Sequence, residues 1–479
     1  MPHFRPFALV AALAISATGC ASFSTPAAVA HPAAPTSWVS DADTSATPDL
    51  AQWWTTLDDP TLTSLVDRAL AGSPDVHAAQ ARLRQARAQQ ARAAAELWPT
   101  VGLSGSASAR RSGTRAIGLD GSTSIVNVIT GSYGTNLDAS WEPDIFGGLG
   151  KGRDAATADL LAVAADLDGV YVSLAGEVAA TYADLRTLQA RLAISERNAA
   201  SQAETHELTG FRAQAGLVSS VDVEQARANL EQTRAGIPSI EAAISQAMFR
   251  LATLTGSEPG ALVGTLTIVA PLPALPASVA VGIPADTLRQ RPDVRAAEHR
   301  VMAETARLAQ ADTDRLPSFG LSGTLGAEIL KGAGSGGTSI LTSVASSVAR
   351  TLFDRGRIRQ QIAIQSATQE QAVAGYEATV LTALEDVESA LVAYEQSGQR
   401  LLSLNAAAEA AGNATLLARS QYAAGLSDFQ TVLSTERTVL AVQESVAITE
   451  GDRVAALVQL YKALGGGWSP EAISGTTGS

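Results

Sequence analysis

Residues with chemically reactive side chains are few in this chain and poorly spaced for catalysis. The histidines form no metal-binding pattern such as His-Glu-x-x-His, and no nucleophile elbow or phosphate-binding loop occurs; they are His3, His31, His77, His206 and His299. Gly332, Gly334 and Gly337 match the Gly-x-Gly-x-x-Gly spacing of dinucleotide sites, but they fall between two strand-like stretches. We therefore expect a hairpin loop there, no metal or cofactor, and no enzymatic activity.

The single cysteine, Cys20, follows a segment with the features of a secretory signal. Arg5 precedes an apolar run over residues 7–17, and Ala17-Thr18-Gly19 leads into Cys20. A lone cysteine cannot form an internal disulfide, so its position indicates lipidation, with diacylglycerol and an N-acyl chain on Cys20. The box resembles the bacterial lipoprotein pattern, although Ala17 and Thr18 depart from it. The alternative is an ordinary signal peptide with an incidental cysteine. No Asp follows Cys20, which favours sorting to the outer membrane.

Composition favours closely packed helices. Of the 479 residues 46% are apolar but only 5% are aromatic, and Ala, Leu and Val dominate. The longest uncharged run, over residues 259–285, contains five prolines, so we interpret it as a linker and not as a membrane helix. A net charge of −13 argues against nucleic acid as a partner, while solubility is its simpler explanation.

The chain contains a tandem duplication. Residues 74–105 reappear at 292–323 with a constant offset of 218, and 14 of the 32 positions are identical. Each copy passes through an Ala-rich helical stretch, a proline, a stretch that alternates apolar and small residues, and a very long helical stretch. We therefore expect the same elements twice.

Each copy predicts one long α-hairpin. Residues 152–214 lack proline and would form a helix of about 95 Å, and residues 357–424 lack proline and place apolar side chains near every 3.5 residues, as in coiled coils. Each long helix meets a glycine, Gly216 or Gly425, and a return helix follows over about 221–254 or 428–464.

Between the short and long helices we expect β-hairpins. Four stretches alternate apolar with polar or small residues, which predicts strands of about 10 to 14 residues, the length of an outer-membrane β-strand. A soluble pair of hairpins is the alternative from alternation alone. Four strands cannot close a spanning barrel, and open edges are not tolerated in lipid. A membrane location therefore requires oligomerisation.

The expected organisation has six parts. A signal peptide occupies 1–19, a lipidated tether 20–50, the first repeat 51–270, a linker in an equatorial region 271–291, the second repeat 292–468 and a tail 469–479. Within the first repeat we expect short helices, a β-hairpin over 100–146 and an α-hairpin over 152–255. Within the second we expect a helix over 292–316, a β-hairpin over 317–353 and an α-hairpin over 356–464.

Four motifs complete the sequence evidence: Trp141-Glu142-Pro143-Asp144-Ile145-Phe146-Gly147, Arg291-Pro292-Asp293-Val294, Leu352-Phe353-Asp354-Arg355-Gly356-Arg357, and Leu460-Tyr461-Lys462-Ala463-Leu464-Gly465-Gly466-Gly467-Trp468. Together they resemble the outer-membrane factors of TolC type, in the NodT-like lipoprotein branch that serves resistance-nodulation-division (RND) efflux pumps. The resemblance covers about residues 50–468. It implies a mainly α-helical fold with transmembrane β-structure: a homotrimer whose twelve-stranded outer-membrane barrel, four strands from each chain, stands on a periplasmic tunnel of α-hairpins.

The resemblance also implies functional residues. In this family the hairpin tips contact a periplasmic adaptor protein, which corresponds here to Gly216, Leu217, Tyr422, Gly425 and Leu426; the glycines would also turn the chain without such a contact. Polar residues after the second tip close the periplasmic entrance, which corresponds to Gln430, Ser434 and Arg437. Ser434 stands where related proteins often have Asp, so Glu436 or Asp428 is an alternative latch residue.

The function implied is a passive exit duct in the outer membrane for small toxic compounds, driven by an inner-membrane RND pump through the adaptor. There are two alternatives, the first within transport and the second of a different class. One is the outlet of a type I protein secretion system, against which Cys20 argues; the other is a structural lipoprotein spanning the periplasm, which predicts a continuous heptad array without the strand-like stretches. The sequence does not identify the exported compound.

Overall fold

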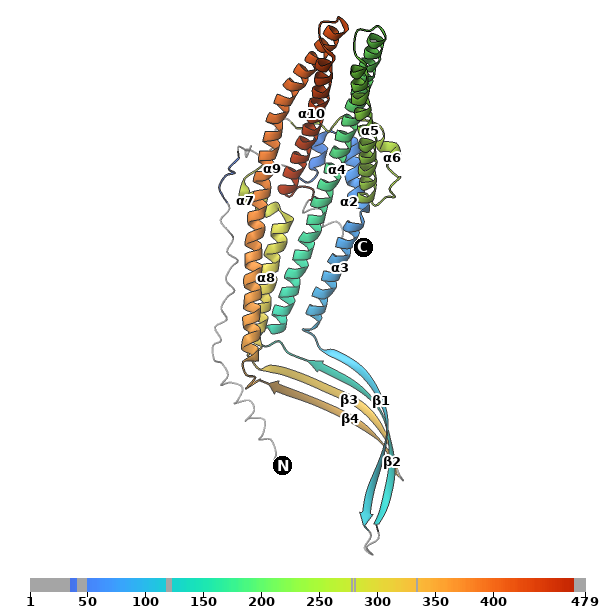
Figure 1. Cartoon of the computed structure of the whole chain (residues 1–479). Coiled ribbons are helices and arrows are strands. Elements are labelled where there is room, and N and C mark those ends of the chain that lie inside the picture. The colour runs from blue at the N-terminus through green and yellow to red at the C-terminus, as the bar shows by residue number, and fades with distance from the viewer. Residues whose placement is uncertain are drawn as a thin grey trace.

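The protein is a long helical body that continues into a curved β-sheet (Figure 1). This computed structural model describes residues 35–40, 50–117, 123–276, 279, 281–332 and 335–468. The lipidation expected at Cys20 and the loop position Gly334 lie outside these residues. No helix within the described ranges is long and apolar enough to cross a membrane.

The two repeats form equivalent elements. The first contains the 3-10 helix η2 (Trp53–Leu57), α2 (Pro60–Gly72), α3 (Pro74–Ala95), strands β1 (Thr100–Ile117) and β2 (Thr123–Trp141), α4 (Gly148–Gln214) and α5 (Ser220–Leu254). After the short helices α6 (Val263–Leu266) and α7 (Pro284–Gln290), the second contains α8 (Pro292–Thr313), strands β3 (Ser318–Gly332) and β4 (Ser335–Ala349), α9 (Arg357–Ala423) and α10 (Phe429–Ala463).

The long helices run the length of the body. Helices α4 and α9 have 67 residues each, which corresponds to about 100 Å. Helix α5 packs back along α4, and α10 packs back along α9, so two α-hairpins result. The hairpins contact each other through α4 and α10, while α3 and α8 lie along the sheet-proximal halves of α4 and α9 (Figure 1).

Aspartates from two of the sequence motifs start the long helices. Asp144 accepts hydrogen bonds from the backbone N–H groups of Leu149 (3.2 Å) and Gly150 (2.7 Å). Asp354 accepts from those of Gly356 (2.8 Å) and Ile358 (2.9 Å). A carboxylate that accepts from the free N–H groups of a first turn stabilises that helix end. Helix α4 consequently begins at Gly148, before the expected residue 152.

The main core lies near the middle of the body, where the two repeats meet. Trp53 stacks on Tyr461 with ring centroids 5.0 Å apart, and both belong to a cluster drawn from η2, α2, α4, α5, α9 and α10. The buried guanidinium of Arg291 donates to the carbonyl oxygens of Ala383 (3.3 Å) and Ala463 (3.0 Å) and pairs with Asp293 and Asp386. Arg291 thus joins the start of α8 to α9 and to the end of α10.

A short N-terminal segment is held on α9. The indole N–H of Trp38 donates to the carbonyl of Gly282 at 2.9 Å. The Glu388 carboxylate accepts from the backbone N–H of Val39 (2.6 Å) and from the backbone N–H and hydroxyl of Ser40 (3.1 and 2.7 Å). The four groups fix residues 38–40 against the helical body, and we call this contact the N-terminal clip.

The sheet is antiparallel in the order β1-β2-β3-β4. The strands have 18, 19, 15 and 15 residues, so the expected length of 10 to 14 was too short. Hydroxyl pairs help to extend the pairing, as between Thr100 and Ser140 (2.8 Å) and between Ser108 and Ser132 (2.9 Å). Gly332 pairs with Ser335 at the β3–β4 turn, which places the Gly-x-Gly-x-x-Gly pattern in a hairpin.

Helix α8 ends at Thr313, three residues before the expected boundary at 316. Leu316 precedes Pro317, and a residue in that position is displaced from the helical region by the proline ring. Strand β3 begins directly afterwards at Ser318.

Candidate channel wall and entrance

The two faces of the sheet differ in chemistry. Directly paired residues point to the same face, and the register of all three strand pairs is continuous. One face, the apolar face, carries odd-numbered residues of β1, β2 and β3 with even-numbered residues of β4; its large exposed members are Val101, Leu103, Ile125, Ile129, Tyr133, Leu137, Trp141, Leu321, Leu325, Ile329, Ile340, Val344 and Val348. The opposite face is mostly Ser, Thr and Gly, with Leu330 and Leu341 as its large exposed apolar members.

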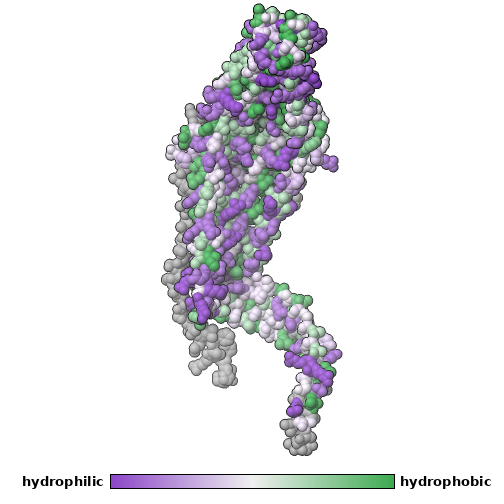
Figure 2. Space-filling model, viewed as in Figure 1, coloured by the Kyte–Doolittle hydropathy of each residue, from purple (hydrophilic) through white to green (hydrophobic). Residues whose placement is uncertain are grey.

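This separation has the form of a membrane wall. Large aliphatic side chains exposed together on one face of a sheet require a nonaqueous neighbour, while the polar face suits water. Strands β1 and β4 are the sheet edges, and neither has a second partner strand among the described residues. The arm of the sheet is paler and greener than the helical body, with a hydrophilic band toward its far end (Figure 2).

At the opposite end of the body, each α-hairpin turns through a glycine. Gly216 and Gly425 have φ values of +73° and +78°, which side chains with a Cβ rarely adopt. The N–H of Leu217 donates to the carbonyl of Arg212 (2.9 Å), and that of Leu426 donates to the carbonyl of Gln421 (2.8 Å). These are the 6→1 bonds of Schellman motifs, so both helices end in the same way. Leu217 and Leu426 are 65% and 80% exposed.

Tyr422, expected with these tip residues, lies beneath the tip. It is 2% exposed and packs on Phe429 with ring centroids 5.9 Å apart. The Arg212 guanidinium lies 4.6 Å from the centre of its ring and donates to its backbone carbonyl. Tyr422 therefore ties the two hairpin tips together within the chain, and its ring is buried.

Gln430, Ser434 and Arg437 lie on one exposed face of α10, as their spacing requires. Arg437 Nε donates to the Asn229 side-chain oxygen of α5 at 3.0 Å, and the Gln430 amide donates to Gln225 of α5. The Ser434 hydroxyl turns back to its own helix and donates to the carbonyl of Thr431 at 3.0 Å. Two side-chain bonds thus join α10 to α5 just beyond the tips.

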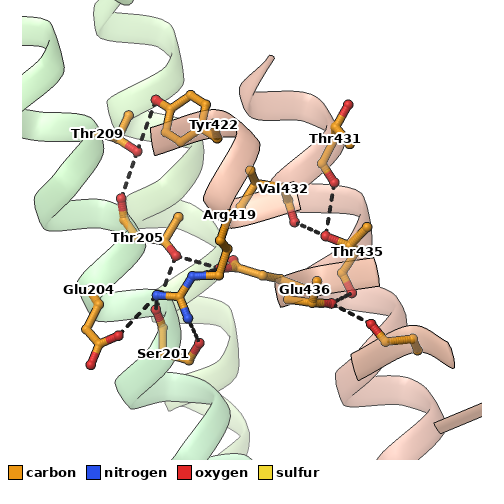
Figure 3. A network of polar contacts seen from close by, with 12 residues as sticks. Ser201, Glu204, Thr205, Thr209, Arg419, Tyr422, Thr431, Val432, Thr435 and Glu436 are labelled. Carbon is orange, nitrogen blue, oxygen red and sulfur yellow. Dashed lines mark hydrogen bonds and ion pairs between the residues drawn. The ribbon is translucent and has the colours of Figure 1, made fainter. Parts of the chain in front are cut away.

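Glu436 lies elsewhere, in a buried cluster between the hairpins (Figure 3). It is 4% exposed and accepts from the Thr205 hydroxyl of α4 at 2.6 Å. Arg419 of α9 lies 4.0 Å from it and also donates to Ser201 (2.6 Å) and Glu204 (3.1 Å). Burial raises the pKa of Glu436 above its ordinary value, although Thr205 and Arg419 oppose this. We call Glu436, Thr205 and Arg419 the buried cluster, and Glu204 lies at its exposed edge.

Asp428 is the N-cap of α10 and not a contact between helices. Its carboxylate accepts from the N–H and the hydroxyl of Thr431 at 2.9 and 2.6 Å. These bonds hold the pKa of Asp428 below its ordinary value. The sequence interpretation missed Gln225 and Asn229, whose i, i+4 spacing on α5 puts them on one face opposite the α10 residues.

Comparison with known proteins identifies the family. The family model for outer membrane efflux proteins matches residues 65–257 and 283–466. The chain belongs to the outer membrane efflux protein family. It is 32% identical over 424 residues to nodulation protein T of Rhizobium leguminosarum bv. trifolii, covering 88% of this chain and 89% of the relative. It is also 32% identical to the pyoverdine export outer membrane protein OpmQ of Pseudomonas putida, covering 96% and 97%.

Solved structures agree with this assignment. The outer-membrane channel OprN matches with a TM-score of 0.81 and 35% identity over 91% of this efflux protein and 98% of that chain. The open state of the MtrE channel of Neisseria gonorrhoeae shares the fold, with a TM-score of 0.77 at 24% identity. The efflux protein is therefore located in the outer membrane and is an exit duct of a tripartite efflux system. The family consists of channels and not of enzymes, and it requires no cofactor.

Proposed function

We propose that three copies of this efflux protein form one duct, in which their sheets close a barrel of twelve strands and their α-hairpins form a periplasmic tunnel. The observation that carries this proposal is a sheet with one apolar face and two edge strands, β1 and β4, each paired on one side only within the part of the chain that the structure describes. Unpaired strand edges are not tolerated in lipid, and pairing β4 of one copy with β1 of the next removes every edge.

In this arrangement the apolar face contacts lipid and the polar face lines the lumen. The α-hairpins extend away from the membrane into the periplasm, with the tips at the far end. Residues 1–19 would be removed, and Cys20 would carry the diacylglycerol and N-acyl chains. Mass spectrometry of membrane-purified protein tests this, because the mature chain should begin at acylated Cys20.

We infer that the tips receive a periplasmic adaptor, which links the duct to an inner-membrane RND pump. The exposed side chains of Leu217 and Leu426 offer apolar contacts beside Gly216 and Gly425, and the buried core of a protein–protein interface is more apolar than the rest of the surface. The exported compounds would be small and toxic; relatives are named for solvent, toluene and pyoverdine export, and the pump would select among such compounds.

The bonds from Gln430 and Arg437 to α5 would act as the latch of the entrance. Both join the hairpins where an outward movement of α10 must separate them, and a hydrogen bond from a charged donor contributes roughly 1.5 to 3 kcal/mol. Arg437→Ala should therefore favour the open entrance. Arg437→Lys keeps the charge but not the guanidinium geometry, so its effect should be intermediate.

The duct is tested with purified protein in mild detergent and in planar bilayers. Native mass spectrometry should give three chains, and the trimer should form channels whose conductance rises with Arg437→Ala. The control is Arg400→Ala, which changes an exposed arginine on α9 farther from the tips. It should leave conductance unchanged. A monomer that still forms channels would contradict the trimer, whereas equal conductance of all variants would place the latch elsewhere.

A further inference from the structure

One face of the sheet carries only positive charge within the described strands. Six charged side chains lie in the described strands: Arg110, Arg111, Arg115, Asp138, Glu328 and Lys331. By the continuous register, Arg111, Arg115 and Lys331 lie on the apolar face. Arg110, Asp138 and Glu328 lie on the polar face. Each charge on the apolar face within the described strands is thus positive, whereas the polar face carries both signs.

The three cations also lie at one end of the sheet. Arg111 is directly opposite Ile129 and Arg115 opposite Ile125, and both pairs are nearer to the β1–β2 turn than to the helical body. Lys331 is opposite Gly131, beside the β3–β4 turn. The apolar face nearer to the body, by contrast, carries no charged residue in the described strands.

The position of the cations matches the outer boundary of a membrane. From Val101 to Arg111 there are ten residue steps, or about 33 Å along the strand, which becomes about 25 Å of height at a tilt of about 40°. This height equals that of the outward-facing apolar band of an outer-membrane barrel. Arg111 would then lie at the outer edge of the hydrocarbon, and Arg115, four residues on, would lie among the headgroups.

We propose that Arg111, Arg115 and Lys331 form a binding surface for the phosphate groups of the phosphorylated glycolipid in the outer leaflet. This proposal rests on the proposed barrel, which makes the apolar face the lipid-facing one. All three side chains are exposed. Arg111 and Lys331 are separated by two strand spacings and two residues, or about 12 Å, so their long side chains can converge on one headgroup.

Charge complementarity selects this partner. Lysine and arginine at a membrane boundary extend toward the headgroups and bind phosphate with charge-assisted hydrogen bonds. In a zwitterionic phospholipid, each phosphate is neutralised by the cation of the same headgroup. A glycolipid with two phosphates has no such cation and keeps its negative charge. No carboxylate on this face of the described strands competes for the three cations.

The test compares neighbouring residues that face opposite sides. The first variant combines Arg111→Gln, Arg115→Gln and Lys331→Gln, and the matched control is Arg110→Gln on the polar face. Purified trimers are titrated with diphosphoryl lipid A and with inorganic phosphate, and binding is followed by native mass spectrometry. Each cation near a lipid surface contributes about fivefold, so the triple variant should bind lipid A on the order of 100-fold more weakly, while Arg110→Gln should bind it as the unmodified trimer does.

Two results would contradict the proposed binding surface. One is an unchanged affinity of the triple variant for lipid A, and the other is an equal loss of lipid A affinity in Arg110→Gln. Displacement of lipid A by millimolar inorganic phosphate would also contradict it, because a site for free phosphate does not need a membrane. Conductance in bilayers of phosphatidylcholine separates this inference from the duct itself. If the unmodified protein forms no channel there, the proposed duct is contradicted. If all variants conduct and the triple variant binds lipid A as tightly as the unmodified protein, only the proposed binding surface is contradicted.

Discussion

At the scale of single residues, the buried cluster between the hairpins is the least expected feature. Glu436 is a carboxylate on the buried face of α10, where Phe429, Val432, Leu433 and Val439 are apolar. The neighbouring Thr205 and Arg419 supply one short hydrogen bond and a charge at 4.0 Å. Such a group specifies one alignment of two helices, because a shift along the axis would leave it unpaired.

The pH dependence of this contact follows from the pKa of Glu436. Because burial raises that pKa in the packed state, the packed state binds a proton more readily than separated helices do. The contribution of Glu436 to the packing of α10 on α4 is therefore most favourable below its ordinary pKa, and it is lost as the pH rises through the raised value. The Tm of the unmodified protein should therefore rise as the pH falls from 7.5 to 5. Glu436→Gln should show a smaller rise, because it lacks the titrating carboxyl group.

Thermal unfolding of the trimer at both pH values measures this difference. Glu224→Gln, an exposed residue of α5, serves as the control and should keep the full rise. If the rise is the same for Glu436→Gln and the unmodified protein, the titration of Glu436 does not contribute to the packing.

At the scale of the elements, a glycine stabilises the turn at the end of a helix but destabilises the helix interior. Gly425 has a positive φ at the turn after α9, whereas Gly412 lies inside α9 with open space where a Cβ would be. A Cβ is strained in the first setting and favourable in the second.

Gly425→Ala should therefore destabilise the hairpin by about 1 kcal/mol, and Gly412→Ala should stabilise it by up to about 1 kcal/mol. Hydrogen exchange of the tip amides, measured on the trimer, reports both effects. Faster exchange is expected at the tip in Gly425→Ala only. Equal exchange in the two variants would mean that the turn can be made without the left-handed conformation.

The elements could be predicted from the sequence better than the contacts between them. The duplication and the long runs without proline predicted both α-hairpins, because a period of 3.5 residues persists over many turns. Strand lengths were underestimated, since alternation alone does not show that pairing continues past Arg110-Arg111. The partners of Gln430 and Arg437 could not be predicted, because they lie on α5 and depend on how the hairpins pack. The spacing of Phe429, Val432, Glu436 and Val439 was a usable signal that Glu436 is buried.

At the scale of the whole molecule, one side chain ties together three helices of the second repeat. Arg291 contacts α8, α9 and the end of α10 through two carboxylates and two backbone carbonyls. Its side chain is 9% exposed, whereas both aspartates are nearly half exposed. Arg291 therefore acts as a fixed joint in the middle of a body about 100 Å long.

Removing this joint should affect the entire body. Arg291→Ala should lower the free energy of unfolding by about 3 kcal/mol, because it leaves two buried carbonyl oxygens without a donor, each at a cost of about 1 to 3 kcal/mol. Arg291→Lys should recover only part of this loss, because an ammonium cannot reproduce the planar fork. Urea unfolding of the trimer tests both variants. Arg289→Ala, an exposed residue two positions earlier, is the control and should change little.

The N-terminal clip on α9 would limit how far the helical body can move from the lipid proposed at Cys20. From Cys20 to Trp38 there are 18 residue steps, which span at most about 65 Å when extended. From Glu388 back to the sheet-proximal end of α9 at Arg357 there are 31 residues of helix, or about 47 Å. The extended segment is therefore only slightly longer than the distance along α9 to the sheet, so a lipid on Cys20 would reach the membrane only with the segment nearly extended. If Cys20 carries the lipid proposed above, the closed clip would limit the depth of the body below the bilayer to the length of this segment.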